Sequence, residues 1–268
     1  MAAIDHFNED IARSRAIIDL ADPLPHGTPA ESLVRDDLLR SSWMFAVGAS
    51  DAYFCDLYTD LLACVLMCKE RQPNIALPRS ILTTDVPLEA VYADYAQRQN
   101  WRWRMMARRR MERENVLAID TIKQLLNPFL RDDHKLFGDV IDTWIAQPGA
   151  TRWIFGLAPA AYQAQMAATA GELDQRIRER TQKGLRNSAA GALKRRYTAI
   201  IQRRHDCIHN CDRPKVALRR VRSANSVRRV VRDVEFLVAN VDAHISTEFR
   251  QFLLGLGCSP QTVNQVGY

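Results

Sequence analysis

The chain has 268 residues, 47% of them hydrophobic and 25% charged, so it is long and apolar enough to bury a substantial core. Its first residues lack the basic start and apolar run of a secretory signal, and no uncharged stretch approaches the ~20 residues that a membrane span requires. Six cysteines do not make the dense framework of a small secreted scaffold, so we expect reduced thiols. These features exclude a membrane protein and predict a soluble, cytoplasmic one.

Apolar residues recur at helical spacing along most of the chain. Over 33–71 this spacing, uninterrupted by proline, indicates one long helix or two that meet near Gly48. Further segments with a helical pattern are 88–126, 134–146 and 170–185. The stretch 147–164 is rich in proline and glycine and is expected to be a connection.

Two more helices are predicted towards the carboxyl terminus. One covers 187–210 and ends where Pro214 prevents its continuation. The other covers 223–254, where the valines favour a strand locally but recur at helical spacing, over a length far beyond that of a strand. The predicted fold class is therefore all-α.

Positive charge is concentrated in one segment, although the formal net charge is only +6. Residues 175–232 hold 18 lysines and arginines but only three acidic residues, Glu179, Asp206 and Asp212. Such asymmetry is typical of a protein that binds a polyanion, because phosphate contacts supply affinity and steer association. The alternative is that these side chains form the solvated face of surface helices.

The densest group of chemically active side chains is QRRHDCIHNCDRP, residues 202–214. Its histidines and cysteines alternate, which raises the question of a metal site. On a helix, however, the pair His205 and His209 is separated from the pair Cys207 and Cys211 by about 200 degrees. Four ligands cannot then converge on one ion, so we expect no metal. A half site of two histidines would need a carboxylate from elsewhere.

The same stretch resembles the signature of the HEPN superfamily of ribonucleases. That signature is an arginine, a polar residue, three further residues and a histidine, here Arg204, His205 and His209. The wider stretch RRHDCIHN resembles the form found in bacterial HEPN proteins of the RiboL-PSP type, and residues 38–57, LLRSSWMFAVGASDAYFCDL, resemble the first long helix of that branch. Residues 72–170 match no family.

The resemblance implies a single HEPN-like helical bundle over residues 1–268, with 72–170 as additional helices inserted in the middle. It also implies a metal-independent endoribonuclease without a cofactor, which leaves 2′,3′-cyclic phosphate and 5′-hydroxyl ends. Similar proteins are toxins or antiphage effectors and form homodimers with a composite active site. A regulatory protein partner is a further expectation.

Roles for the motif residues follow from the resemblance and from their chemistry. His209 suits proton transfer and Arg204 suits stabilisation of charge on the phosphate. His205 and Asn210 are candidates to orient the scissile phosphate, and Asp206 to hold Arg203 or Arg204. Arg204 and His209 point about 140 degrees apart on an ideal helix, so the arginine must swing across or the helix must loosen.

Other basic residues are expected to contact RNA phosphates without sequence preference. They are Arg203, Arg195, Arg196, Arg213, Lys215, Arg219 and Arg220, with Arg222, Arg228 and Arg229 as further candidates. The run WRWRMMARRR, residues 101–110, is either a second RNA surface or a packed helix whose arginines are exposed.

Two other functions remain open from the sequence. A HEPN fold can act without catalysis, as a module for dimerisation or nucleic-acid binding. A basic helical protein can also bind DNA, although no clear helix-turn-helix is visible.

Overall fold

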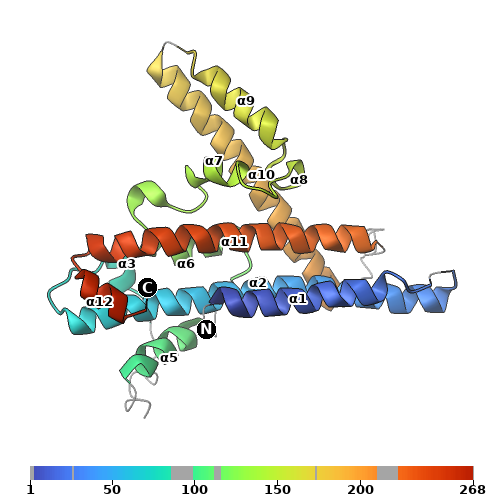
Figure 1. The fold of residues 1–268 in the computed structure, drawn as a ribbon, viewed down its shortest axis with the longest axis horizontal. Helices are drawn as coiled ribbons and strands as arrows, with labels where there is room; N and C mark the ends of the chain where they lie inside the picture. Colours follow the sequence, from blue (N-terminus) through green and yellow to red (C-terminus); the bar gives the residue numbers. More distant parts are fainter. Residues whose placement is uncertain are drawn as a thin grey trace. The chain divides into compact units, whose positions relative to one another are not determined.

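A computed structural model of the chain shows an all-α fold, as predicted (Figure 1). The structure describes residues 3–25, 27–85, 99–111, 116–172, 174–209 and 223–267. Within these ranges the backbone forms α-helices and two short 3-10 helices, and no strand. None of the described helices has both the length and the apolar character that crossing a membrane requires.

The α-helices are α1 (Ala3–Ala21), α2 (Pro29–Arg71), α3 (Arg79–Leu82), α5 (Gln99–Met111), α6 (Ile119–Leu126), α7 (Val140–Ile145), α8 (Arg152–Phe155), α9 (Pro159–Thr169), α10 (Gln175–His209), α11 (Ala224–Gly255) and α12 (Pro260–Gln265). The 3-10 helices are η2 (Asn127–Phe129) and η3 (Asp132–His134).

The segment 33–71 forms one continuous helix, α2, and Gly48 does not interrupt it. A capping box starts the helix, because Thr28 N donates to Glu31 Oε2 at 3.0 Å and Glu31 N donates to Thr28 Oγ1 at 3.3 Å. Burial of residues on both sides of Gly48, such as Val47 and Ala49, offsets the low helix propensity of glycine. The last predicted helix is also confirmed, as α11.

Five predicted segments differ from the structure. The segment 88–126 is not one helix, because residues 116–118 separate α5 from α6: Val116 N donates to Asp51 Oδ1 and Ala118 is extended. The helix expected over 134–146 starts only at Val140, after Phe137 adopts a φ of 61°, which an α-helix does not allow.

The two helices expected over 170–185 and 187–210 are one helix, α10. It starts at Gln175 because Asp174 Oδ1 accepts hydrogen bonds from the amides of Arg176, at 2.8 Å, and Ile177, at 3.3 Å. The expected connection 147–164 instead contains α8 and the start of α9, and the side chains of Ile154 and Phe155 are buried.

The chain divides into two compact units. Unit 1 comprises residues 1–4, 51–136 and 241–268, and unit 2 comprises residues 5–50 and 137–240. The segment 72–170 is shared between them, and its assignment as an insertion into a single domain stays a prediction.

The core of unit 1 contains a run of aromatic contacts. Phe129 lies edge-to-face against Tyr58 and Phe249, with ring centroids 5.7 and 6.2 Å apart, and Phe249 stacks on Phe252 at 6.0 Å. Such contacts join the carboxyl-terminal part of α2, η2 and α11 through large buried side chains.

Two arginines of helix α5 in unit 1 bind carboxylates of α2. Arg104 pairs with Asp60 at 2.8 Å, and both Arg102, at 3.3 Å, and the indole Nε1 of Trp103, at 2.7 Å, bind Glu70. These contacts favour the packed-helix interpretation of residues 101–110 over an RNA surface. The side chain of Trp101 lies outside the described part.

Unit 2 is built around α1, the amino-terminal part of α2, α10 and the amino-terminal part of α11. Ser14 of α1 and Ser42 of α2 exchange buried hydrogen bonds, and each hydroxyl donates to the other residue's carbonyl at 2.8 to 2.9 Å. Arg15 of α1 pairs with Glu235 of α11. Helices α7, α8 and α9 pack on α10 (Figure 1).

Candidate nucleic-acid interface

Arg204 lies in the last turns of α10, on the helix face that packs into unit 2. Residues at alternating spacings of four and three share this face. They are Leu193, Tyr197, Ile200, Arg204 and Cys207. Four of the five are buried, and Arg204 is partly buried. Arg204 therefore projects from the packed side of the helix and not from its solvent side.

Two hydrogen bonds with α2, one donated by each helix, fix the turn of α10 that precedes Arg204. The indole Nε1 of Trp43 donates to the carbonyl of Ile200 at 3.0 Å, and the hydroxyl of Tyr197 donates to Ser50 Oγ at 2.8 Å. Trp43 and Ser50 belong to the stretch that resembles the first long helix of the HEPN branch. The stretch 38–57 thus contacts α10 in the turn just before the motif, within unit 2.

Among the described residues, Asp206 does not bind the arginine that we expected it to hold. Asp206 Oδ1 accepts a hydrogen bond from Gln202 Nε2 at 3.2 Å, and within the described ranges it holds neither Arg203 nor Arg204, which corrects the expected role of Asp206. In the same part of the chain Arg204 forms no ion pair. A partly buried guanidinium of this kind retains its donors for an external anion.

Several predicted site residues lie outside what the structure describes. His209 is the last residue of α10, but its side chain is outside the described part. Other predicted residues are wholly outside: Asn210, Arg213, Lys215, Arg219 and Arg220. The meeting of Arg204 with His209 stays a prediction. His205 is described and partly buried, one position after Arg204.

The neighbouring arginines Arg195 and Arg196 have different surroundings. Arg195 is exposed. Arg196 forms an ion pair with Asp233 of α11, with its Nη2 and Nε at 2.6 and 2.7 Å from Oδ2. The Asp233 side chain is only 5% exposed, and this burial raises its pKa although Arg196 opposes the shift. Arg196 thus joins α10 to α11, and we do not retain it among the RNA-binding residues.

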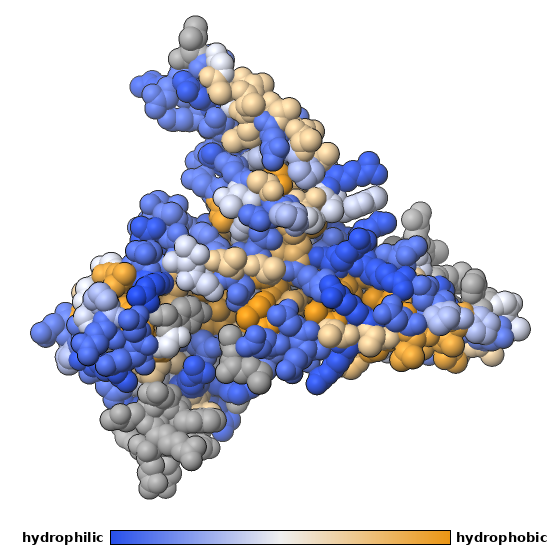
Figure 2. Space-filling view, in the orientation of Figure 1, coloured by the Kyte–Doolittle hydropathy of each residue, from blue (hydrophilic) through white to orange (hydrophobic). Residues whose placement is uncertain are grey.

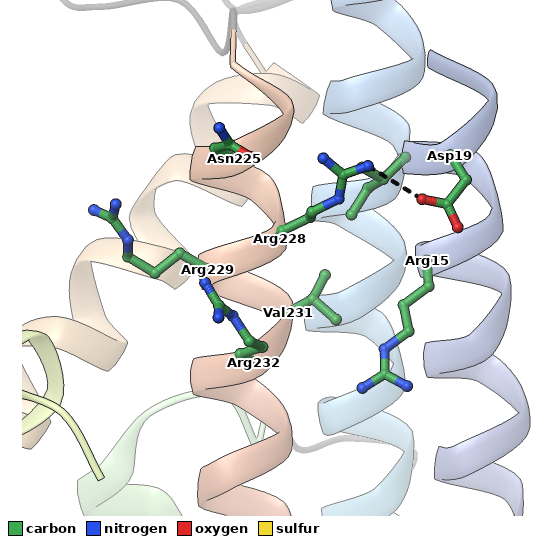
Figure 3. A pocket seen from close by; sticks show the side chains of 8 residues that line it. Arg15, Asp19, Asn225, Arg228, Arg229, Val231 and Arg232 are labelled. Atoms are coloured by element: carbon green, nitrogen blue, oxygen red, sulfur yellow. Dashed lines mark hydrogen bonds and ion pairs between the residues drawn. The ribbon is translucent and has the colours of Figure 1, made fainter. Parts of the chain in front are cut away.

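A pocket of about 600 Å³ lies between α1 and α11 of unit 2, and sequence reasoning did not identify it (Figure 3). Four arginines line it: Arg15, Arg228, Arg229 and Arg232. The sequence suggested Arg228 and Arg229 as phosphate contacts but gave no reason to join them to Arg15, which lies more than 200 residues earlier.

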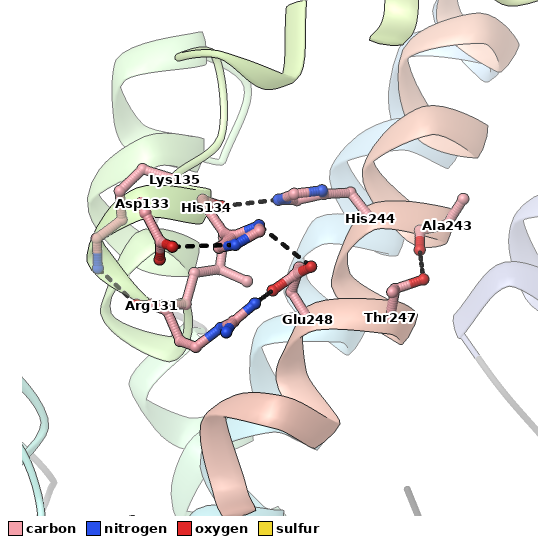
Figure 4. Close-up of polar contacts among 9 residues, drawn as sticks. Arg131, Asp133, His134, Lys135, Ala243, His244, Thr247 and Glu248 are labelled. Atoms are coloured by element: carbon pink, nitrogen blue, oxygen red, sulfur yellow. Dashed lines mark hydrogen bonds and ion pairs between the residues drawn. The ribbon is translucent and has the colours of Figure 1, made fainter. Parts of the chain in front are cut away.

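A second cluster of titratable groups, which sequence reasoning also missed, lies in unit 1 (Figure 4). Glu248 of α11 accepts from Arg131 Nη2 at 2.7 Å and lies 3.2 Å from His134 Nδ1. The other ring nitrogen of His134 lies 3.2 Å from Asp133 Oδ2, and His244 Nε2 is 2.7 Å from the His134 carbonyl oxygen.

The charged and polar groups of this cluster bind one another, through ion pairs and hydrogen bonds. The hydrogen bond to Glu248 raises the pKa of the Arg131 guanidinium. Lys135 Nζ donates to the carbonyls of Asn127 and Leu130, at 2.9 and 2.6 Å. These contacts attach residues 131–135 to α11 and satisfy the carbonyls around η2, so the cluster stabilises a connection.

The described residues contain no group of three or more histidines, cysteines and carboxylates arranged to hold a metal ion. Comparison of the chain with protein families, with curated proteins and with solved structures finds no match. The functional interpretation therefore depends on the residues themselves.

Proposed function

We propose that the chain is a metal-independent endoribonuclease of HEPN type. The observation that carries the proposal is Arg204, a partly buried guanidinium without an ion pair in the described ranges, five residues before His209 on the most basic helix. The contact of the preceding turn with Trp43 and Ser50 supports it, because one stretch that resembles the family then packs directly before the other along α10.

The proposed reaction uses the substrate's own 2′-hydroxyl as nucleophile. A bond forms between the 2′-oxygen and phosphorus while the bond from phosphorus to the 5′-oxygen breaks, which leaves a 2′,3′-cyclic phosphate and a 5′-hydroxyl. The 2′-proton passes to a base, and the departing 5′-oxygen takes a proton from an acid. His209 supplies a group that can serve either role near neutral pH. Arg204 stabilises the additional negative charge on the phosphate oxygens.

One histidine does not readily serve as base and acid in the same step, and a symmetric homodimer provides two. An outward stripe on α2 supports self-association. Its members recur at spacings of four, three and four: Val34, Leu38, Ser41 and Phe45. Val34 and Phe45 are 56% and 50% exposed. In Figure 2 apolar surface gathers where α1 ends and α2 begins, and a contiguous exposed apolar patch commonly marks an interface.

The biological setting that we propose is a toxin or antiphage effector that acts on cytoplasmic RNA, with a separate protein that restrains it. This setting rests on the resemblance to HEPN ribonucleases and on the concentration of positive charge in residues 175–232.

The deciding experiment compares RNA cleavage by the full-length protein with that by Arg204→Ala and His209→Ala, in excess EDTA. We expect cleavage to fall by at least ~100-fold in each variant, since each removes a group that acts in the transition state. Arg176→Ala is the control, because Arg176 is an exposed arginine at the other end of α10. Activity that survives both substitutions, or that disappears with EDTA, contradicts the proposal.

A second candidate is a HEPN-like module that binds RNA without cutting it. The arginine-lined pocket between α1 and α11 favours this candidate, because it offers anion-binding groups that do not depend on His209. The two candidates separate in one measurement. If the protein binds RNA but produces no cleaved ends, at a protein concentration at which it is dimeric, the result supports the binding module and excludes the nuclease.

A further inference from the structure

The pocket between α1 and α11 has an apolar base and a cationic wall. Ile18 of α1 and Val231 of α11 line it and are each 1% exposed. The charged lining consists of four arginines, Arg15, Arg228, Arg229 and Arg232, and one carboxylate, Asp19. In Figure 3 Arg15 of α1 and Arg228 of α11 lie between the two helices, whereas Arg229 lines the pocket from the side of α11 that is turned away from α1. The volume of about 600 Å³ is in the range that accommodates a nucleotide-sized group.

Carboxylates already engage two of the four arginines. Arg15 pairs with Glu235, and Arg228 pairs with Asp22 at 2.8 Å and with Asp19 at 3.2 Å. These ion pairs hold the side chains in position along the wall of the pocket. They also reduce the positive charge that the pocket offers, so the anion-binding capacity depends mainly on the other two.

Arg229 and Arg232 form no ion pair with any residue in the described ranges. The guanidinium carbon of Arg229 lies 4.6 Å from the ring centroid of Trp153 in α8, and this contact orients the plane of the guanidinium. Arg232 is exposed. An oriented and an exposed guanidinium, three residues apart on one helix, provide donors for phosphate oxygens.

The start of α11 adds to the attraction for an anion. The helix begins at Ala224, and the next residue, Asn225, lines the pocket. No acidic residue occupies the first turn of α11. The partial positive charge of the helix amino terminus is therefore not neutralised within that turn, which favours a bound anion nearby.

We propose that this pocket binds backbone phosphates of a single-stranded RNA through Arg229 and Arg232, assisted by Arg228 and the start of α11. The proposal rests on the proposed function, since it names the surface that holds the substrate strand on unit 2. A strand fits better than a small anion because the sequence that precedes α11 continues the basic character, with Arg213, Lys215, Arg219, Arg220 and Arg222.

The test uses the full-length protein and a fluorescent 12-nucleotide 2′-O-methyl RNA, which lacks the attacking hydroxyl and so is not cut. Binding is measured by fluorescence anisotropy at two salt concentrations. We expect Arg229→Gln with Arg232→Gln to raise Kd about tenfold and to lower the salt slope by about 1.4, at ~0.7 for each lost phosphate contact to a single strand. Thermal unfolding verifies that the variant is folded.

The matched control is Arg176→Gln with Arg180→Gln, which removes the same charge from exposed positions on α10. We expect less than a twofold change in Kd. Equal weakening by the control and the pocket variant overturns the proposal, because the effect is then one of total charge. Asp19→Asn provides the opposite test: it releases one ion pair of Arg228, and we expect it to tighten binding about threefold.

Two further measurements distinguish a mononucleotide from an RNA strand as the ligand, and a failure of the pocket proposal from a failure of the proposed nuclease function. Adenosine monophosphate that competes at micromolar concentration would identify a mononucleotide site and overturn the assignment to a strand. Cleavage that requires His209, with binding insensitive to the pocket variant, overturns this inference alone. Pocket-dependent binding, with cleavage absent or independent of His209, overturns the proposed function and leaves the pocket as an RNA site.

Discussion

The indole of Trp43 in α2 donates a hydrogen bond to the carbonyl of Ile200 in α10, one turn before Arg204. The substitution Trp43→Phe removes the indole donor and keeps an aromatic ring. We expect the free energy of unfolding to fall by about 1 kcal/mol from the lost hydrogen bond, with a further loss from the smaller ring. Urea unfolding measures the change. Trp153→Phe is the control, because Trp153 is 50% exposed, and a loss of equal size there contradicts the prediction.

The ion pair of Arg196 with Asp233 predicts an asymmetric mutational response. Arg196→Met leaves the buried Asp233 carboxylate without its partner, and we expect the free energy of unfolding to fall by about 3 kcal/mol. The double variant Arg196→Met with Asp233→Leu removes both charges and is expected to recover most of that loss. Chemical denaturation of the three proteins gives the comparison. A double variant as unstable as the single one refutes the assigned role.

Two glycines predict opposite effects of substitution by alanine. Gly156 has a φ of 79°, and a Cβ added there would lie 3.1 Å from the Cβ of Ala192, so Gly156→Ala is expected to destabilise unit 2 by about 1–3 kcal/mol. Gly48 lies within α2 and an added Cβ meets nothing within 4 Å, so Gly48→Ala is expected to stabilise the protein by about 0.5–1 kcal/mol. Thermal melts would show shifts of opposite sign.

The buried cysteines predict a decline in stability at alkaline pH. Burial raises the pKa of the Cys64 and Cys68 thiols from 9.0 to about 12. Above pH 9 the unfolded chain loses these protons while the folded chain keeps them, so stability falls as pH rises from 9 towards 12. Each protected thiol contributes about 1.4 kcal/mol per pH unit in that window.

The comparison protein for this effect is Cys64→Ala, which lacks one of these thiols. It should be less stable than the wild type at pH 7, since it leaves a small cavity. We expect the difference in the free energy of unfolding to narrow as pH rises above 9. If the difference in the free energy of unfolding stays constant from pH 7 to pH 11, the pKa of the Cys64 thiol is not raised in the folded protein. Iodoacetamide at pH 8 should label Cys64 only after the protein is unfolded.

The outward stripe on α2 predicts the oligomeric state. Phe45→Glu places a charge in the proposed dimer contact, and we expect the dimer dissociation constant to rise at least ~30-fold, with RNA cleavage lost in parallel. Sedimentation equilibrium measures the first effect. Ile177→Glu is the control, because Ile177 is also exposed but lies at the start of α10.

A composite site further predicts complementation between inactive chains. Mixing the Arg204→Ala and His209→Ala proteins should restore only a small part of the cleavage activity, because each mixed dimer keeps one Arg204 and one His209 but lacks the second histidine of the composite site. The Phe45→Glu substitution in both chains should abolish this rescue. A wild-type protein that is monomeric and cuts RNA would show that the site is complete in one chain.

Local pattern alone determined the fold class and the two best-predicted helices. The apolar spacing of α2 and the valine stripe of α11 repeat over many turns. Such a long repeat at helical spacing is compatible only with a helix. The boundaries inside 72–210 were less accurate, because they depend on single contacts. Asp51 accepts from Val116, Asp174 caps α10, and Phe137 adopts a positive φ, none of which a periodic pattern encodes.

For the candidate site, the sequence by itself identified Arg204, His209 and the basic segment, since residue type and spacing along one helix are local properties. Only the tertiary structure decided which arginines remain available. It pairs Arg196 with Asp233, leaves Arg229 against Trp153, and brings Arg15 of α1 beside the first turns of α11. The physical reason is that such contacts join residues far apart in the chain, and they depend on which helix faces pack together.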